Sequence, residues 1–219
     1  MLSKPLKAFV LTWLATAVLA ANAASAASAG SYEDFFTALQ NDDTRRLSDL
    51  FERGFDPNTR NEKGQPGLTI ALLERSARAV ELLLEQPNTD INALNPAGES
   101  ALMMAALKGD IDTASKLPAR GVKVNQAGWS ALHYAACSPA SKLVQLLIDR
   151  GAELDAASPN DTTPLMMAAQ YGGEDNVRLL IAAGADAGRR NRQGLRAADF
   201  ARLSGREFLV KRLELAAPR

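Results

Sequence analysis

The sequence predicts an all-α solenoid in which about six helix–turn–helix repeats stack one on another. The first observation is a period, because an apolar anchor residue recurs at intervals of 33, 34, 30, 33 and 33 residues. The anchors are Phe35, Leu68, Leu102, Leu132, Leu165 and Ala198. The second observation is that alanines, then leucines, then a glycine follow most anchors in the same order. One such unit cannot bury its apolar face alone, so the recurrence predicts a single continuous stack.

The fifth repeat shows why each unit should form two helices. Thr163 can cap a helix through its hydroxyl, and Pro164 suits the first helical position because no backbone donor is needed there. The pair Gly172–Gly173 should end this helix. Residues 177–181 supply the apolar face of a second helix, which Gly184 can end in a left-handed conformation.

The pattern resembles the ankyrin repeat family, whose units carry a Thr-Pro-Leu-His turn, paired alanines, a leucine pair and a closing Gly-Ala-Asp over about 33 residues. The resemblance implies short hairpin fingers between the repeats and a domain over residues 30–215, followed by a tail at 216–219. The expected repeats lie near residues 31–60, 61–94, 95–125, 126–157, 158–190 and 191–215. The first and last repeats carry many charged residues and should act as caps, because nothing stacks on their outer faces.

The third repeat and the connection after it are irregular. Leu117 is followed by Pro118 where the family has a second leucine, and a proline lacks a backbone donor. This predicts a short second helix with weaker packing. Residues 125–128 replace the longer segment 92–98 of the preceding repeat, so the finger between the third and fourth repeats should be three residues shorter.

The first 29 residues have the composition of a signal peptide for general secretion. Lys4 and Lys7 precede an apolar run over residues 8–21, which is short for a membrane span and is followed by small residues. A retained membrane anchor is the alternative. We expect a periplasmic protein without stable membrane insertion after cleavage, or alternatively a secreted one.

Charge and composition exclude several function classes. The chain has 25 basic and 25 acidic residues, which gives no global signal for nucleic-acid binding. Residues 31–62 have a net charge of −4 and residues 186–219 a net charge of +5. These ends either keep a monomer soluble or, at the basic end, steer an acidic partner or an anionic membrane. No cofactor is expected.

The chain has one histidine, His133, and one cysteine, Cys137. A single histidine excludes a His-cluster metal site, and a single cysteine excludes an intramolecular disulfide. The ankyrin resemblance implies that His133 makes hydrogen bonds between turns. An enzyme with an improvised site at these two residues is the distant alternative, since no acid–base partner is visible in the sequence.

The resemblance implies that a protein partner binds the concave groove and the fingers. Position by position, the expected partner-binding residues are Gln65, Leu73, Glu74, Glu99, Leu107, Lys108, Trp129, Ser138, Thr162, Gln170, Tyr171 and Leu195. Trp129 stands beside the shortened finger, where it either contacts a partner or packs over the loop. Together with Leu107 and Tyr171 it would form an apolar stripe typical of interfaces.

These observations favour a non-catalytic interaction scaffold in the bacterial periplasm. Two roles fit, namely support of an envelope or oxidative-stress enzyme, as for some exported bacterial ankyrin proteins, and neutralisation of a toxin as an immunity protein.

The signal peptide gives a direct prediction. The small residues after the apolar run predict a mature protein that begins between Ala24 and Gly30. N-terminal sequencing of the native protein from the periplasmic fraction checks this. Recovery of intact residues 1–29 in the membrane fraction would show the alternative, a retained anchor.

Overall fold

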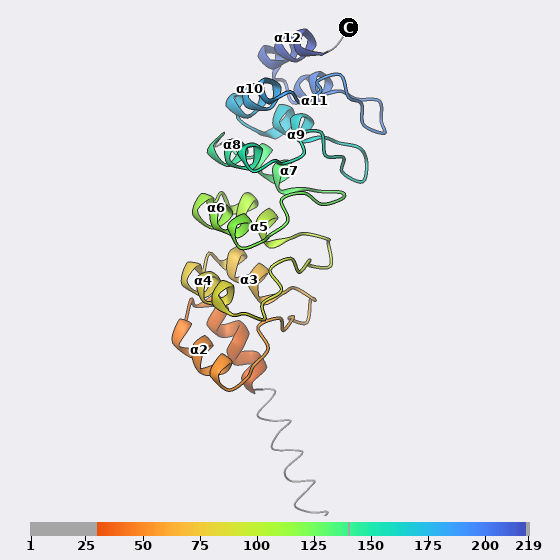
Figure 1. Ribbon diagram of the computed structural model, residues 1–219. Helices are drawn as coiled ribbons and strands as arrows, with labels where there is room; N and C mark the ends of the chain where they lie inside the picture. Colours follow the sequence, from red (N-terminus) through yellow and green to blue (C-terminus); the bar gives the residue numbers. More distant parts are fainter. Residues whose placement is uncertain (1–29, 140, 218–219) are drawn as a thin grey trace, which may run out of the picture.

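The computed structural model describes residues 30–139 and 141–217, so the prediction for residues 1–29 lies outside it. In Figure 1 pairs of helices stack in chain order into an elongated array, with the loops between repeats on one side. Residues 30–40 are helical and precede α2 (Thr44–Glu52). The remaining pairs are α3 (Gly67–Glu74) with α4 (Ala77–Glu85), α5 (Ala101–Lys108) with α6 (Ile111–Ala119), α7 (Ala131–Ala136) with α8 (Ser141–Asp149), α9 (Pro164–Tyr171) with α10 (Glu174–Ala183), and α11 (Ala197–Leu203) with α12 (Glu207–Ala216). The all-α repeat fold is therefore confirmed.

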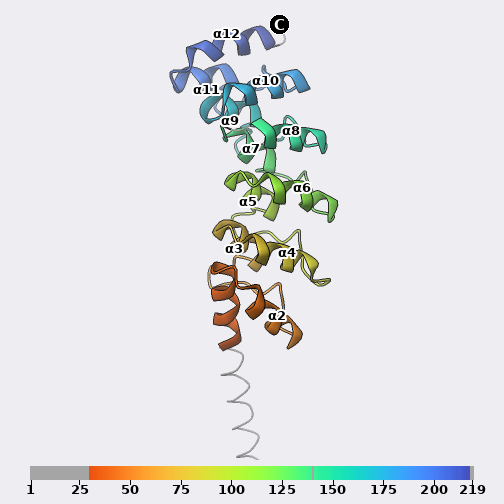
Figure 2. The same cartoon turned by 90° about the vertical axis from the view of Figure 1, so that its left-hand side faces the viewer.

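The first helices and the second helices of the repeats form two layers, which separate in Figure 2 as far as α10. The first helices pack closely because their paired alanines leave room for the neighbouring backbone, and each of these alanines is at most 1% exposed. They are Ala105, Ala106, Ala135, Ala136, Ala168 and Ala169. A leucine at the same position of each second helix from α4 to α12 is completely buried. These are Leu83, Leu117, Leu147, Leu180 and Leu213.

A ladder of side chains joins the closing loop of each repeat to that of the next. The amide oxygen of Asn58 accepts from the backbone N–H of Asp90 at 2.7 Å. The amide nitrogen of Asn58 donates to the carbonyl of Asn88, two residues before Asp90, at 2.8 Å. Asn92 and Asn125 make the same two bonds one and two repeats later. Asp155 accepts from the N–H of Asp186 at 3.0 Å. Each rung satisfies loop backbone groups that would otherwise lack a partner.

The third residue of several first helices accepts a hydrogen bond from the backbone N–H that precedes the helix. The acceptor is the sulfur of Met103 or Met166, Nδ1 of His133 or a carboxylate oxygen of Asp199. Such a bond occupies a donor that the helix itself leaves free. His133 also bonds the carbonyl of Thr162 in the next repeat through Nε2, at 2.9 Å. The expected bond between turns is therefore present.

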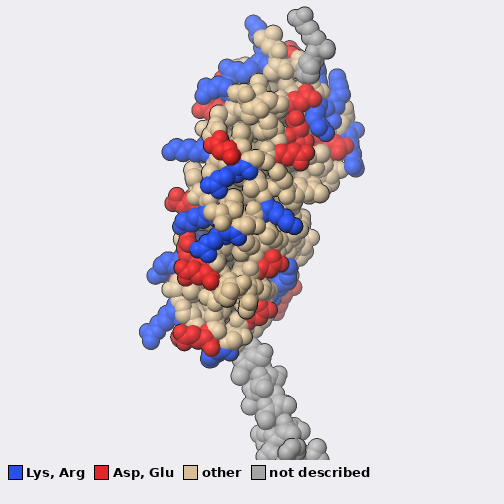
Figure 3. Space-filling view, viewed as in Figure 1, with Lys and Arg blue, Asp and Glu red and all other residues tan. Residues whose placement is uncertain are grey.

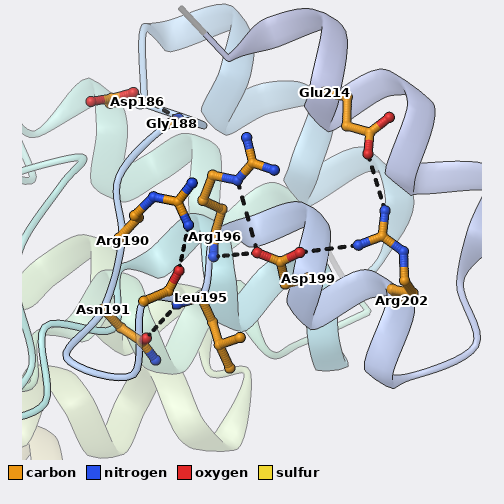
Figure 4. A network of polar contacts seen from close by, with 10 residues as sticks. Asp186, Gly188, Arg190, Asn191, Leu195, Arg196, Asp199, Arg202 and Glu214 are labelled. Carbon is orange, nitrogen blue, oxygen red and sulfur yellow. Dashed lines mark hydrogen bonds and ion pairs between the residues drawn. The ribbon is translucent and has the colours of Figure 1, made fainter.

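The last repeat carries charges where inner repeats carry apolar residues. Leu179 and Ile181 of α10 are half-buried, and their equivalents in α12 are the exposed Arg212 and Glu214. Charged side chains of both signs are interspersed over the face drawn in Figure 3. In Figure 4 Arg202 bridges Asp199 and Glu214, with both distances 3.0 Å. This arrangement suits a terminal repeat that faces water.

The expected shortening of the third repeat's second helix is wrong. Helix α6 has nine residues, the same length as α4, and it includes Pro118. Pro118 stands next to the last helical residue, so the helix loses one backbone hydrogen bond near its end and is not interrupted. Its ring is half-buried at the position that Leu84 occupies one repeat earlier.

The fingers are loops with little regular pairing. Within the described residues, the isolated bridge is between Arg60 and Pro66. Asn61, Asn95 and Asn191 each accept from the N–H groups two and four residues later, which closes a compact turn. The short connection over residues 125–130 keeps the ladder residue Asn125 and has no room for this additional turn.

Gly172 gives a stability prediction with a matched control. A Cβ on Gly172 would lie 2.0 Å from the carbonyl oxygen of Ala136, whereas nothing lies within 4 Å of a Cβ on Gly109 at the equivalent position of the third repeat. We expect Gly172→Asn to lower the free energy of unfolding by about 2 kcal/mol or more, because rigid backbone must move. Gly109→Asn should cost much less, since Asn tolerates the left-handed conformation found there. Urea unfolding compares the two, and equal losses would contradict the prediction.

His133 predicts a pH dependence of stability. Burial lowers the pKa of His133 below its usual value of 6.5, although its bond to Thr162 opposes the shift. As the pH decreases below 6.5, the unfolded chain therefore takes up a proton before the folded one does. The free energy of unfolding should thus decrease as the pH decreases, until the lowered pKa of the folded state is reached. His133→Met, which places at this site the residue found in α5 and α9, should flatten this part of the profile. Identical slopes in urea titrations of both proteins would exclude His133 as the cause.

Candidate partner-binding surface

Two columns of side chains run along the first helices on the side that faces the finger loops. One column contains the residue just before the first alanine, and the other contains the residue three positions later, so the two share one helix face. The first column is Ile70, Met104, Tyr134, Met167 and Phe200, and the second is Leu73, Leu107, Cys137, Gln170 and Leu203. Of the first column, Tyr134 and Met167 are half-buried and the others are buried.

An apolar pocket of about 250 Å³ opens where these columns pass the short connection. Side chains from the first helices of three consecutive repeats meet there. The lining residues are Leu107, Trp129, His133, Tyr134, Cys137 and Met167. Leu107 is 53% exposed at the edge of the pocket, whereas His133 is completely buried beneath it. The pocket thus exposes apolar surface to solvent, and the residue beneath it, His133, is buried.

Polar contacts hold the walls of this pocket in place. The ring of Trp129 meets the ring of His133 edge to face, with centroids 5.2 Å apart. The hydroxyl of Tyr134 donates to the carboxylate of Glu99, which also accepts from Asn95 at 2.7 Å. Burial and the bond to Glu99 raise the pKa of Tyr134, so its hydroxyl stays protonated at neutral pH. The aromatic walls are therefore fixed before any partner arrives.

A second hollow, the N-terminal groove, has a volume of about 500 Å³ and lies between the first two repeats. Helical residues 30–40, the finger at residues 61–65 and α3 form its sides. The lining residues are Tyr32, Glu33, Phe36, Thr37, Gln40, Asn61, Glu62, Lys63, Gln65, Ile70, Leu73 and Glu74. This groove is larger and more polar than the Trp129 pocket.

The structure brings some predicted partner-binding residues together and leaves others apart. Gln65, Leu73 and Glu74 line the N-terminal groove, and Leu107 and Trp129 line the pocket. The other predicted residues line neither hollow. Among them, Tyr171 is 61% exposed, Thr162 is 3% exposed, and Glu99, Lys108, Ser138, Gln170 and Leu195 are half-buried. Thr162 acts through its carbonyl, which receives the bond from His133.

Sequence reasoning missed Tyr134 and Met167 in the pocket and the residues of the first helix in the groove. A signal for Tyr134 and Met167 was present, because the position before the first alanine is large and apolar in each repeat from the second to the sixth. No such signal marks Tyr32 or Glu33, whose repeat departs from the pattern.

The surroundings of Cys137 and His133 do not favour nucleophilic chemistry. Burial raises the pKa of the Cys137 thiol to about 11, and its sulfur lies 3.3 Å from the carbonyl oxygen of His133. Both ring nitrogens of His133 have partners, so neither is directed at the thiol. Within the described residues, no group of three or more His, Cys, Asp or Glu side chains is arranged to hold a metal ion. No described helix is long and apolar enough to cross a membrane.

Comparisons with known proteins agree with this architecture. The model of the family described as ankyrin repeats (3 copies) matches residues 35–127 and 116–191. The chain is 26% identical over 193 residues to the ankyrin repeat protein YahD of Escherichia coli K12, an alignment that covers 69% of this chain and 96% of that protein. It is 31% identical over 147 residues to the nuclear factor NF-kappa-B p105 subunit of Gallus gallus, covering 64% of this chain and only 15% of the length of that relative.

A solved structure shows the same fold. A chain in the complex of the predatory endopeptidase Bd0816 from Bdellovibrio bacteriovorus with the immunity protein Bd3460 matches with a TM-score of 0.72. Sequence identity is 24%, and the match covers 83% of this chain and 96% of the solved one. The period, the paired helices and the family match lead to one conclusion: this chain belongs to the ankyrin repeat family.

Proposed function

We propose that the chain is a non-catalytic protein-binding module that holds one apolar side chain of its partner in the Trp129 pocket. Ankyrin repeats imply protein–protein interaction in general, and the pocket is the observation that carries this particular proposal. It combines Leu107, which is exposed, with an aromatic wall that is fixed by buried neighbours. Interface hot spots have this composition, with aromatic anchors in well-packed surroundings.

The size of the pocket supports a protein partner over a small metabolite. Small-molecule sites typically measure about 300–1,000 Å³ and enclose most of the ligand. The Trp129 pocket is smaller, at about 250 Å³, and it lies on the surface formed by the first helices of consecutive repeats. It therefore suits one side chain that projects from a larger surface.

The proposed setting is the bacterial periplasm, where the module would support an envelope or oxidative-stress enzyme. The positively charged start, the apolar run and the small residues before Gly30 motivate this setting. The protein is proposed to act as a monomer, because charged residues replace apolar ones on the outer face of its last repeat.

A second candidate function is toxin neutralisation by an immunity protein. The solved chain with the same fold belongs to a complex of an endopeptidase with an immunity protein, and this likeness concerns the fold alone. An inhibition assay with any protease captured from the envelope tests this role. Full protease activity in the presence of excess module would exclude it.

The pocket predicts a difference between two leucines at the same repeat position. Leu107 lines the pocket, whereas Leu203 occupies the equivalent position in the last repeat and is 69% exposed. Leu107→Glu should weaken binding of the partner captured from the periplasmic fraction by about thirtyfold or more, because a carboxylate would enter apolar surroundings. Leu203→Glu should leave the affinity unchanged. Both variants should fold normally, since both residues are largely exposed. Calorimetry with the purified partner decides, and equal affinities would exclude the pocket.

Trp129→Ala gives a second test of the same pocket. Truncation of an interface tryptophan typically costs about 2 kcal/mol, which corresponds to roughly thirtyfold in affinity. Trp129 also contacts His133, so the thermal midpoint must be measured in parallel. A lower midpoint with unchanged affinity of the folded protein would mean that Trp129 only packs over the short connection.

A further inference from the structure

The N-terminal groove contains three carboxylates that form no ion pair with any other described residue. Glu33, Glu62 and Glu74 come from three different segments and line the same groove. None of them forms an ion pair within the part of the chain that the structure describes. Asp34, the neighbour of Glu33, is instead paired with Arg46 at 3.4 Å. The negative charge of the groove is therefore not neutralised by an ion pair, unlike that of the neighbouring Asp34.

The floor and walls of the groove are apolar and partly aromatic. Tyr32 and Phe36 lie edge to face, with ring centroids 4.9 Å apart, and both are half-buried. Ile70 and Leu73 contribute aliphatic surface from α3. An arginine or lysine side chain fits such surroundings, because its stem can pack on apolar and aromatic surface while its charged end meets carboxylates.

We propose that this groove binds a cationic side chain, flanked by an apolar one, on the same partner protein that enters the Trp129 pocket. The inference rests on the proposed function, since it assigns a second contact to that partner. Two observations support a shared interface. The groove and the pocket both lie along the first helices, and Leu73 and Leu107 occupy equivalent positions in neighbouring repeats. The negative charge of the groove is complementary to a basic segment.

Lys63 is the cation within the groove and does not neutralise it. Its side chain forms no ion pair with the three glutamates, and three carboxylates against one ammonium leave a net charge of −2 in the lining. Removing the three carboxylates should thus reverse the preference of the groove, while Lys63 stays in place.

Short peptides test the groove without any knowledge of the partner. The probe is a capped pentapeptide with two arginines on either side of a leucine, and its control contains citrulline, which keeps the shape and removes the charge. In ¹⁵N-labelled protein we expect the arginine peptide to shift amide signals at residues 62–65 and 73–74. The citrulline peptide should bind roughly tenfold more weakly, because several exposed charge pairs are lost.

A pair of triple variants separates local from global charge. In Glu33→Gln/Glu62→Gln/Glu74→Gln the arginine peptide should bind roughly tenfold more weakly than in the wild type. The control variant carries the same change in net charge at exposed glutamates outside the groove and should bind within about twofold of the wild type. Its substitutions are Glu52→Gln, Glu85→Gln and Glu207→Gln. Equal losses in both variants, or equal binding of both peptides, would overturn the proposal.

Two further measurements separate a failure of the pocket proposal from a failure of the groove proposal. Leu107→Glu should leave the peptide affinity unchanged, so loss of partner binding without loss of peptide binding concerns the pocket alone. Conversely, intact partner binding in the groove variant would overturn the shared interface and leave the proposed function standing. Amide signals of the groove could also shift with protein concentration in the absence of peptide. That result would mean that a second copy of the chain, through its basic last repeat, supplies the cation. It would overturn the proposal that a separate partner protein does so.

Discussion

Each repeat of this chain buries its apolar face only against the repeats on either side, and the rest of the structure depends on that stacking. Paired alanines let the first helices approach, and buried leucines of the second helices fill the space between the layers. Side chains such as Asn58 and Asn92 then join successive closing loops. Because every unit relies on its neighbours, the register must be kept even where the sequence departs from the repeat.

The short connection shows how this constraint shapes a surface. Three residues are missing, yet Asn125 still bonds the next closing loop. The shorter connection therefore lacks the compact finger turn and keeps the ladder. Trp129 follows directly and lies against His133 at the wall of the pocket. The shortened connection thus lies next to an apolar hollow on the first helices.

The same stacking explains why the chain's one histidine serves structure. Met103, His133, Met166 and Asp199 occupy one position of the repeat, and each accepts the backbone N–H that precedes its helix. Sulfur, imidazole and carboxylate differ in chemistry but all present an acceptor at that point. His133 adds a bond to the carbonyl of Thr162 in the next turn, and its burial lowers its pKa, which favours the neutral ring. Its role is therefore set by position in the repeat.

The sequence by itself determined the repeat number, the helix pairs and the residues that cap or end them, because the period and the turn residues are local signals. It also indicated Leu107 and Trp129 as surface residues. Only the tertiary structure decided that Tyr134, Cys137 and Met167 join them in one pocket, since the pocket draws on three consecutive repeats that meet through stacking. The same holds for Pro118, where the length of α6 depends on its place beside the helix end and on the neighbouring repeats. It holds too for Glu33, Glu62 and Glu74, whose common groove depends on how the first repeat packs against the second.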